Sequence, residues 1–408
     1  MGETATSETQ LIYLVLCKNG VEGDGRLSRK HEDKDLDLEM QLKLLNKPAV
    51  KSIKTKYGDI YDCVDITKQS AFDHPLLRNH TIQMKRSSFS IGMINKELLE
   101  SKPSKIGVKS IMCPPRTVFI RRTQKEDIIR AKSQVRRYPG IGNAHQLNQK
   151  SPGYHFATFE LRSSNMKYYG AKLYISIDQP MVFSSNQFSE AVLWVENGPT
   201  DQLNSIQVGW TVNPKLFGDN RTWVFSYWTA DGFHTTGCFN LLCPGFVQVS
   251  CKKPLGFAYP LISVYRGKQY EDEFFLLKDS KSGNWWFVSY IDDRQEEPVG
   301  YWPSTLFTTL RDSASMIASG GEVYSPTSES SPTMGKGLLP IGNLTMATAA
   351  RKLQFVDEKN SLVDPDASLL KLQMDSPACY KVESLPPYNE NWINIWRTRW
   401  CMWNMICY

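Results

Sequence analysis

Two stretches of alternating apolar and polar residues near the middle of the chain predict neighbouring β-strands. They are Ile206–Val212 and Thr222–Thr229, and the turn-rich residues Asn213–Asn220 separate them. Alternation with a period of two is typical of strands because successive side chains point to opposite faces of a sheet. The corner that follows, CFNLLCPG, contains two cysteines and a Pro-Gly pair. We therefore interpret Ser205–Gln248 as a strand, a loop, a second strand and a cysteine-linked corner.

More short strands are expected in the second half of the chain. They are Ala171–Ile177, Phe188–Glu196, Phe274–Leu277 and Trp285–Ile291, and the last two form a hairpin around a turn at residues 279–284. Many short strands with few helices predict an antiparallel β-sandwich or jelly roll. The aromatic content of 12%, with 11 Trp and 18 Tyr, also favours β-structure.

The first 150 residues have a mixed pattern that predicts a small α+β unit. The expected strands are Val50–Ile53, Ile60–Ile66 and Arg116–Ile120, with a turn at Tyr57–Asp59. The expected helices are Leu38–Leu45, which stops before Pro48, and Thr123–Gln134. Thr123 is expected to cap the second helix, with Glu126 as its capping-box partner.

Charge divides the chain into two halves of opposite sign. Residues 1–150 contain 27 Lys and Arg against 17 Asp and Glu, and residues 151–408 contain 21 against 25. We expect the two halves to attract each other. No basic patch interleaved with aromatic residues is present, so no nucleic-acid partner is expected. No apolar run is long enough to span a membrane, which predicts a soluble protein.

The nine cysteines indicate disulfides in an oxidising compartment. They lack paired CxxC spacing and a His cluster, so we expect no metal and no other cofactor. Cys238 and Cys243 span a short loop and are expected to pair, and Cys63 and Cys113 are the well-placed pair of the first half. Sequons at Asn79, Asn220 and Asn343 are compatible with secretion and glycosylation. The N-terminal apolar run Leu11–Cys17 is a weak signal region.

Long ungapped segments of both halves resemble the plant neprosin family of peptidases. In the front half, LKLLNKPAVKSIK, GDIYDCVDITKQSAFDHPLLRNHTIQM and CPPRTVFIRRTQKEDIIRAK are similar to the family's activation peptide. In the back half, YYGAKLYISI, FSEAVLWVENGP, the block from Ser205 to Gln248, VGYWPSTLF and GGEVYSP are similar to its peptidase domain. The resemblance covers roughly residues 36 to 380.

With this resemblance, we expect five parts in the chain. These are a degenerate or truncated signal region (1–30), an activation peptide (31–135), a cleavable linker (136–152), a neprosin-type β-sandwich peptidase domain (153–380) and a divergent tail (381–408). The tail contains Trp392, Trp396, Trp400 and Trp403, whose spacing would place them on one face of a helix. A membrane-surface helix is one interpretation, and a tail foreign to the fold or an altered gene end is the one we prefer.

The resemblance implies a secreted glutamic peptidase, made as a zymogen, in which two glutamates activate water. One of the two positions is Glu322, in Gly320-Gly321-Glu322-Val323, where an ordinary turn is the alternative interpretation. The other position is occupied by Gln207 rather than glutamate. Glutamine resembles a protonated glutamate in shape and can donate an N–H, but it cannot give up a proton. The fungal eqolisin peptidases use a glutamine and a glutamate, so by resemblance a Gln207/Glu322 pair is chemically credible.

The remaining expectations concern the substrate and the activation peptide. The founding member of the family cleaves after proline, and Trp194, Trp210, Tyr227 and Trp228 could line a cleft that stacks on a proline ring or could be core residues. The resemblance also implies that Cys379 forms a disulfide near the C-terminus. The expected partners are a peptide or protein substrate and the chain's own activation peptide, in the apoplast or vacuole. A non-catalytic relative that binds cell-wall polysaccharide or protein is the alternative function. Acid is expected to loosen the activation peptide by protonating carboxylates that hold it.

Overall fold

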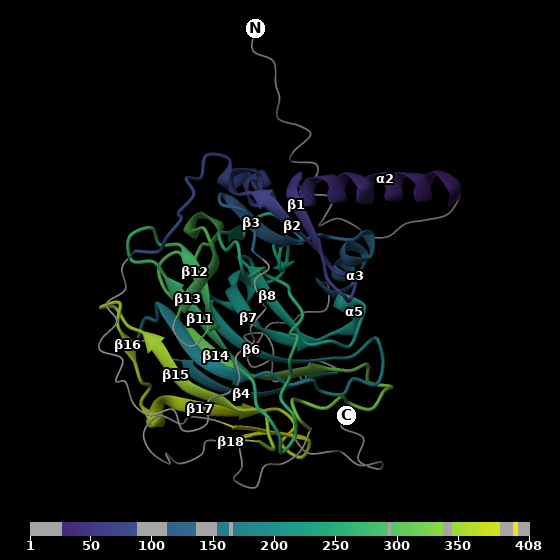
Figure 1. Cartoon of the computed structure of the whole chain (residues 1–408). Coiled ribbons are helices and arrows are strands. Elements are labelled where there is room, and N and C mark those ends of the chain that lie inside the picture. The colour runs from purple at the N-terminus through teal and green to yellow at the C-terminus, as the bar shows by residue number, and fades with distance from the viewer. Residues whose placement is uncertain are drawn as a thin grey trace.

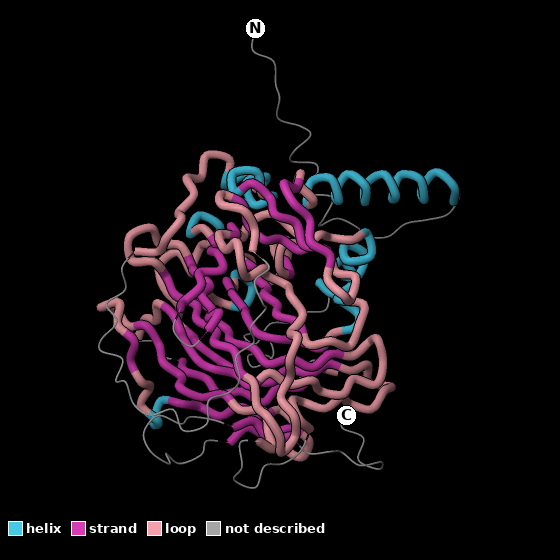
Figure 2. The backbone as a smooth tube through the Cα atoms, viewed as in Figure 1, coloured by secondary structure: helices cyan, strands magenta, loops and turns pink. Residues whose placement is uncertain are grey.

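The computed structural model describes residues 27–87, 112–135, 153–162, 166–292, 295–337, 345–383 and 395–398. Two seven-stranded antiparallel sheets lie face to face, and a smaller unit built from residues 27–135 lies at one end of them (Figures 1 and 2). We call this smaller unit the N-terminal unit. The expected β-sandwich preceded by a small α+β unit is confirmed.

The first sheet has the strand order β17-β4-β14-β6-β7-β8-β9. These strands are β17 (Leu370–Met374), β4 (Tyr154–Arg162), β14 (Met316–Tyr324), β6 (Phe188–Asn197), β7 (Asn204–Val212), β8 (Trp223–Thr229) and β9 (Cys238–Phe239). The short helix α5 (Pro214–Phe217) lies in the loop between β7 and β8, capped by the Asn213 side chain and ended by Gly218 with φ +83°.

The second sheet has the order β10-β13-β12-β11-β5-β15-β16. Its strands are β10 (Val247–Gln248), β13 (Gln295–Trp302), β12 (Trp285–Asp292), β11 (Glu271–Lys278), β5 (Gly170–Ser176), β15 (Ala350–Val356) and β16 (Leu362–Val363). The predicted hairpin is β11 and β12, which pair antiparallel. A separate pair consists of β18 (Tyr380–Glu383) and β19 (Ile395–Thr398).

The main core lies between the two sheets. Phe159, Leu193 and Val208 of the first sheet belong to one apolar cluster with Leu173 and Phe274 of the second, and each is at most 1% exposed. Alternation along each strand sends every second side chain into this core. Burial of one such side chain contributes about 1.5–3 kcal/mol to stability, so this core dominates the energetics of the fold.

The N-terminal unit contains a three-stranded sheet of order β1-β2-β3 and two helices. The strands are β1 (Ala49–Lys54), β2 (Ile60–Asp65) and β3 (Thr117–Arg121), and the helices are α2 (Leu27–Leu45) and α3 (Lys125–Val135). Gly58 turns the chain from β1 to β2 with φ +93°, a conformation that favours glycine. A disulfide joins Cys63 to Cys113 across 50 residues.

Three local predictions differ from the structure. Helix α2 is longer than predicted, because it includes the charged residues before Leu38 as well as the amphipathic end. Helix α3 begins at Lys125, and the Gln124 N–H donates to Asp127 Oδ2 at 2.8 Å, so Asp127 rather than Glu126 is the capping acid. The backbone of Thr123 instead bonds Asn46, whose side chain bridges its N–H and carbonyl oxygen.

The tail is also different from the predicted helix. Residues Ile395–Thr398, which include Trp396, form strand β19 against β18, so a continuous helix through the four tryptophans is wrong. The predicted linker, most of the signal region and the rest of the tail lie outside the described residues. No helix in the described part of the chain is long and apolar enough to cross a membrane.

We predict that replacing both Cys63 and Cys113 with serine lowers the free energy of unfolding of the N-terminal unit by about 2–5 kcal/mol, because the open chain gains conformational freedom. Denaturant unfolding of the full-length chain with limited proteolysis as readout measures this. The control is Cys251→Ser, since Cys251 is a free cysteine among the described residues. Equal midpoints for the double variant and the control would contradict the prediction.

Candidate functional site

Gln207 and Glu322 lie on the same face of the first sheet, the one turned away from the main core. Ile206 and Val208 flank Gln207 in β7 and belong to the main core, as does Val323 beside Glu322 in β14. Because side chains alternate along a strand, Gln207 and Glu322 must both point to the opposite face. We call this the outer face. Glu322 therefore lies within a strand, and the turn interpretation of its sequence is wrong.

The strand register sets how far apart the two side chains start. Strand β6 lies between β7 and β14, and Gln207 pairs with Trp194 of β6, which pairs with Ala318 of β14. Glu322 is four residues further along β14 than Ala318. In a flat sheet, two strands and four residues separate Cα atoms by about 16 Å. Gln207 and Glu322 thus face a common region rather than bond to each other.

A row with little side-chain bulk separates these two positions. It contains Gly320 of β14, Val192 of β6 and Gly209 of β7, which are register partners in that order. A Cβ at Gly209 would meet the carbonyl oxygen of Ala191 at 2.1 Å, so the close approach of β6 and β7 requires glycine there. Gly320 and Gly209 therefore both belong to the floor of the site, whereas Gly321 faces the main core, where a Cβ would meet Met334.

Hydrogen bonds orient the Gln207 side chain. Its Nε2 donates to Ser205 Oγ at 3.2 Å, and the Ser205 hydroxyl donates to Glu196 Oε1 at 2.9 Å. Gln207 is 0% exposed, and its Oε1 has no hydrogen-bond partner among the described residues. A buried amide held at one end and unsatisfied at the other costs stability, which is typical of a group kept for a ligand.

The four aromatic residues predicted near the site divide between the two faces. Trp194 and Tyr227 are the register partners of Gln207 on either side and share the outer face with it. Trp210 and Trp228 instead point into the main core, so for them the core alternative is the right one. The reason is the strand period: Trp210 lies three positions from Gln207, and Trp228 one position from Tyr227.

Aromatic packing and burial fix Tyr227 beside Gln207. Its ring packs edge-on against Phe239 at 4.6 Å between centroids and stacks on Phe233 at 5.8 Å. Burial, with a smaller contribution from Asp231, raises the pKa of Tyr227 above its usual value. Tyr227 is therefore a neutral phenol at acidic and neutral pH.

The outer face is covered in this form of the chain. Gln207 and Trp194 are 0% exposed and Glu322 is 1% exposed. Ala131 of α3, in the N-terminal unit, belongs to the same apolar cluster as Trp194 and Tyr227. Arg130 of α3 also donates through Nε to the carbonyl oxygen of Leu216 in α5 at 3.1 Å. In this form of the chain, Gln207 and Glu322 are therefore inaccessible to a substrate.

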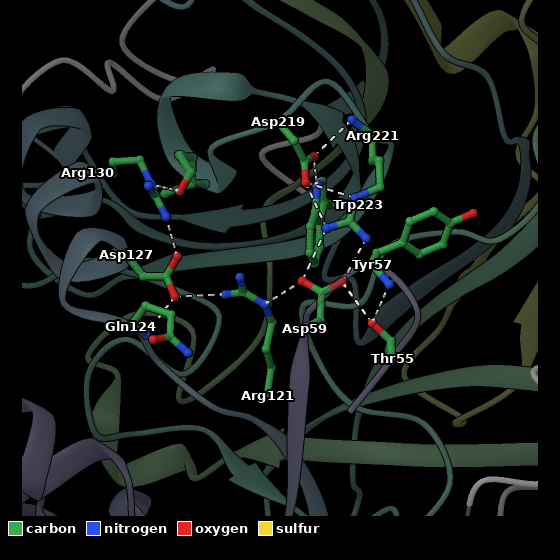
Figure 3. Close-up of polar contacts among 11 residues, drawn as sticks. Thr55, Tyr57, Asp59, Arg121, Gln124, Asp127, Arg130, Asp219, Arg221 and Trp223 are labelled. Carbon is green, nitrogen blue, oxygen red and sulfur yellow. Dashed lines mark hydrogen bonds and ion pairs between the residues drawn. The ribbon is translucent and has the colours of Figure 1, made fainter. Parts of the chain in front are cut away.

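An ionic network joins the N-terminal unit to the sandwich near this cover (Figure 3). Arg221, between α5 and β8, donates to both carboxylate oxygens of Asp59 at 2.7 and 3.1 Å and to Asp219. Its guanidinium also lies over the Trp223 ring, 4.5 Å from the centroid. Burial alone would lower the pKa of Arg221, but the hydrogen bonds to Asp59 and Asp219 outweigh it and raise the pKa. Bidentate pairing of this kind is specific in geometry as well as favourable.

The network continues into the N-terminal unit, as Figure 3 shows. Arg121 of β3 lies 3.9 Å from Asp59 and 3.1 Å from Asp127 of α3, which also accepts from Arg130 at 2.6 Å. The carboxylate of Asp59 belongs to the basic half of the chain and its partner Arg221 to the acidic half. The main ion pair across this boundary, between Asp59 and Arg221, thus has the opposite polarity to the one that the charge division predicts. The ion pair between Arg86 and Glu296 has the predicted polarity.

Further hydrogen bonds cross the same boundary at the second sheet. The side-chain amide of Gln69 makes two hydrogen bonds to the backbone of Gln248. Its Nε2 donates to the Gln248 carbonyl oxygen at 3.0 Å, and its Oε1 accepts from the Gln248 N–H at 2.8 Å. The Ser87 N–H and hydroxyl both donate to the carboxylate of Asp279. Burial raises the pKa of Asp279, but hydrogen bonds from Ser282 and Ser87 outweigh it and lower the pKa below the usual range.

The other residues singled out from the sequence have these positions. The disulfide between Cys238 and Cys243 is present after β8, and Cys379 is disulfide-bonded. Asn79 and Asn220 are exposed, whereas Asn343 lies outside the described residues. Sequence reasoning missed Glu190, Glu196 and Ser205. The alternation of Phe188–Glu196 could have indicated that the side chains of Glu190 and Glu196 share a face.

Two family models match successive parts of the chain. The sequence model of the neprosin family matches residues 185–395, just over half of the chain, and that of the neprosin activation peptide matches residues 52–160. Among solved structures, scytalido-glutamic peptidase with a peptide-based transition state analog is 8% identical, covering 60% of this chain and 97% of its own, with a TM-score of 0.32. SCP-B, a member of the eqolisin family of peptidases in a complex with the tripeptide Ala-Ile-His, is 8% identical, covering 60% and 98%, with a TM-score of 0.31.

We predict that Trp210→Phe lowers the free energy of unfolding by about 1 kcal/mol more than Trp194→Phe does. Both side chains are fully buried, but only Trp210 donates its Nε1–H within the described residues, to the Ser176 carbonyl oxygen at 2.9 Å. Denaturant unfolding of the two full-length variants measures the difference. Equal losses would show that the hydrogen bond from Trp210 to the Ser176 carbonyl oxygen adds no stability.

Proposed function

The chain belongs to the neprosin family, and we propose that it is the zymogen of a glutamic-class endopeptidase in which Gln207 and Glu322 activate water. The observation that carries the proposal is that these two residues lie on one covered face, with the Gln207 amide held in place between Trp194 and Tyr227 and its oxygen without a partner among the described residues. Acid–base hydrolysis of a peptide needs a base for water and a donor for the carbonyl oxygen that becomes negative.

Each residue has a distinct role in this chemistry. The Glu322 carboxylate takes a proton from water, and the resulting hydroxide oxygen bonds to the carbonyl carbon of the peptide. The Gln207 amide binds that water or donates an N–H to the developing oxyanion, as a protonated glutamate would do through its O–H. Gln207 has no proton to give to the leaving amine, so a carboxyl group supplies it: either Glu322, once it has taken the proton from water, or a neighbouring carboxyl group.

The substrate is proposed to be a peptide or protein that contains proline. The rings of Trp194 and Tyr227 flank Gln207 on either side, and a proline ring stacks well on such aromatic faces. Disulfides at Cys63–Cys113 and Cys238–Cys243 and exposed sequons at Asn79 and Asn220 support a secreted glycoprotein of a plant, in the apoplast or vacuole.

The N-terminal unit is proposed to act as the activation peptide that keeps the site closed until the medium is acidic. Asp279 holds Ser87, and its pKa in the folded chain is lowered. A carboxylate whose pKa is lowered in the folded chain stabilises the folded state. This stabilisation is complete above the pKa of the unfolded chain, about 4, and is lost as the pH falls through the lower pKa of the folded chain. Acid therefore weakens this contact, and the chain becomes open to cleavage between the two units.

Catalysis is tested on the full-length chain after activation by acidification, with a proline-containing peptide at acid pH. We expect Glu322→Gln to lower kcat by about 10²–10⁴-fold, because the general base is lost. Gln207→Glu should retain activity, and Gln207→Ala should lower kcat by about 10²–10³-fold through loss of the oxyanion donor. Glu358→Gln, at an exposed position, is the control.

An activated chain that cleaves nothing, or a Glu322→Gln variant as active as the parent, would overturn the peptidase proposal. Binding of cell-wall polysaccharide or of an intact protein by that inactive chain would then favour a non-catalytic relative.

The acid dependence of activation is tested with Asp279→Asn. Since this variant lacks the carboxylate at every pH, we expect its processing to begin at a higher pH and to depend less steeply on pH than that of the parent. The shortened form is measured on gels over a pH series. The control is Asp312→Asn, because the pKa of Asp312 is lowered by its hydrogen bond to Lys167, and both residues belong to the sandwich. An identical onset in parent and Asp279→Asn would contradict the proposed role of Asp279.

A further inference from the structure

The outer face brings a second carboxyl group closer to Glu322 than Gln207 is. Glu190 of β6 is the direct register partner of Glu322 in β14. Ala191 and Leu193 of β6 belong to the main core, so Glu190 points to the outer face, as Glu322 does. Side chains at directly opposite positions of an antiparallel pair have Cβ atoms about 4.5–5.5 Å apart. The two carboxyl groups are therefore immediate neighbours on the sheet.

We propose that Glu190 is a catalytic residue of this chain: it shares one proton with Glu322 and delivers it to the leaving amine. The inference rests on the peptidase function proposed above and assigns the proton donor that Gln207 cannot be. Glu190 would then donate the proton that a glutamate at position 207 could have donated.

Burial and charge explain why the pair would hold a proton. Glu190 is 2% exposed and Glu322 is 1% exposed. Two carboxylates at directly opposite positions of a sheet repel each other, so ionisation of one opposes ionisation of the other. Such a pair titrates as a unit, with one group protonated while the other is ionised. This is the state that acid–base hydrolysis needs: a carboxylate to receive a proton and a carboxylic acid to give one.

An independent observation indicates that a ligand binds in the same row. Thr211 of β7 is the register partner of Glu190 on its other side and is 0% exposed. Its Oγ1 has no hydrogen-bond partner among the described residues. A buried hydroxyl without a partner costs about 1–3 kcal/mol, and an extended peptide laid across the outer face would offer it a backbone group. One row across three strands thus contains Thr211, Glu190 and Glu322. It lies beside the row of Gly320, Val192 and Gly209.

The reaction balances with these groups alone. The Glu322 carboxylate removes a proton from water, and the hydroxide oxygen bonds to the peptide carbonyl carbon, which places the negative charge on the carbonyl oxygen. The C–N bond then breaks as the Glu190 carboxyl group transfers its proton to the amine nitrogen. Glu322 is left protonated and Glu190 ionised, and transfer of one proton between the two neighbours restores the starting state. One water and one peptide bond become one carboxylic acid and one amine.

Two other buried glutamates on the outer face do not meet these conditions. Glu196 accepts the Ser205 hydroxyl that orients Gln207. Glu160 of β4 is opposite Ala318 in β14, in the row of Gln207 and four residues away from Glu322 along the sheet. Glu160 therefore offers a matched control, since it is a glutamate with 3% exposure on the same face.

The experiment compares parent, Glu190→Gln, Glu190→Asp and Glu160→Gln, as full-length chains activated by acidification. The dependence of kcat/KM on pH is measured with a proline-containing peptide. We expect a bell-shaped profile for the parent. Glu190→Gln should lower kcat/KM by about 10²–10⁴-fold and lose the alkaline limb, because the acid is gone. Its acid limb should move to higher pH, since the Glu322 carboxylate no longer shares the Glu190 proton.

The two further variants separate a chemical role from a structural one. Glu190→Asp keeps a carboxyl group and should retain both limbs at a reduced rate, whereas Glu160→Gln should match the parent. If Glu190→Gln matches the parent in rate and profile, or if Glu190→Asp also loses the alkaline limb, Glu190 is not the acid.

Infrared titration of the carboxyl groups distinguishes failure of this inference from failure of the peptidase proposal. We expect one carboxylic acid of the shortened parent to stay protonated above the range in which ordinary carboxyl groups ionise. Both Glu190→Gln and Glu322→Gln should abolish that signal, whereas Glu160→Gln should leave it. A parent that cleaves no peptide but shows this pattern would refute the peptidase proposal and retain the coupled pair. Persistence of the signal in either pair variant would overturn the inference.

Discussion

The burial of polar groups on the outer face of the first sheet is the constraint on which the rest of the structure depends. The inner face of that sheet already packs against the second sheet, so the outer face needs its own cover. Four glutamates and a glutamine lie there, none of them more than 3% exposed: Glu160, Glu190, Glu196, Glu322 and Gln207. Burying so many polar groups costs free energy of folding. Such a cost is typical of a face whose polar groups serve a function. A removable cover allows the precursor to be stable and the site to become reactive once the cover has gone.

The N-terminal unit has the properties expected of such a cover. It has its own small sheet and its own disulfide, and it is joined to the sandwich through polar contacts and through apolar ones, since Leu77 and Phe119 belong to the same apolar cluster as the main core. The ion pair between Asp59 and Arg221 fixes its register through geometry, while the contact between Ser87 and Asp279 depends on a carboxylate that acid can neutralise.

The substitution at position 207 and the presence of Glu190 fit together chemically. A glutamine at position 207 keeps hydrogen bonding and loses proton transfer, while a glutamate at position 190 places a carboxyl group opposite Glu322. The site as a whole thereby retains two carboxyl groups and one amide in reach of a peptide. Whether a neighbouring glutamate can replace a missing one depends on strand register, since a shift of one residue would turn Glu190 into the core.

Local sequence patterns are sufficient to predict the strands, the two-part organisation and the family. Alternation and turn residues located β7, β8, β11 and β12 closely, because period, glycine and proline act over a few residues. Local patterns also led to Cys238 with Cys243, which are five residues apart. They could not decide which of two flanking acids caps α3, because Asn46, 77 residues away in the chain, bonds the backbone of Thr123 and helps to set where the helix starts.

Only the tertiary structure decided which residues form the site. Gln207 and Glu322 are far apart in the chain, and the insertion of β6 between their strands, which no local pattern predicts, brings Glu190 opposite Glu322. The same register sends Trp194 and Tyr227 to the outer face and Trp210 and Trp228 to the core. Composition predicted attraction between the two halves, yet the main ion pair has the reverse polarity, because a contact depends on which side chains meet and not on net charge. Strand order and register are set by the burial of whole faces, and that is a property of the folded chain.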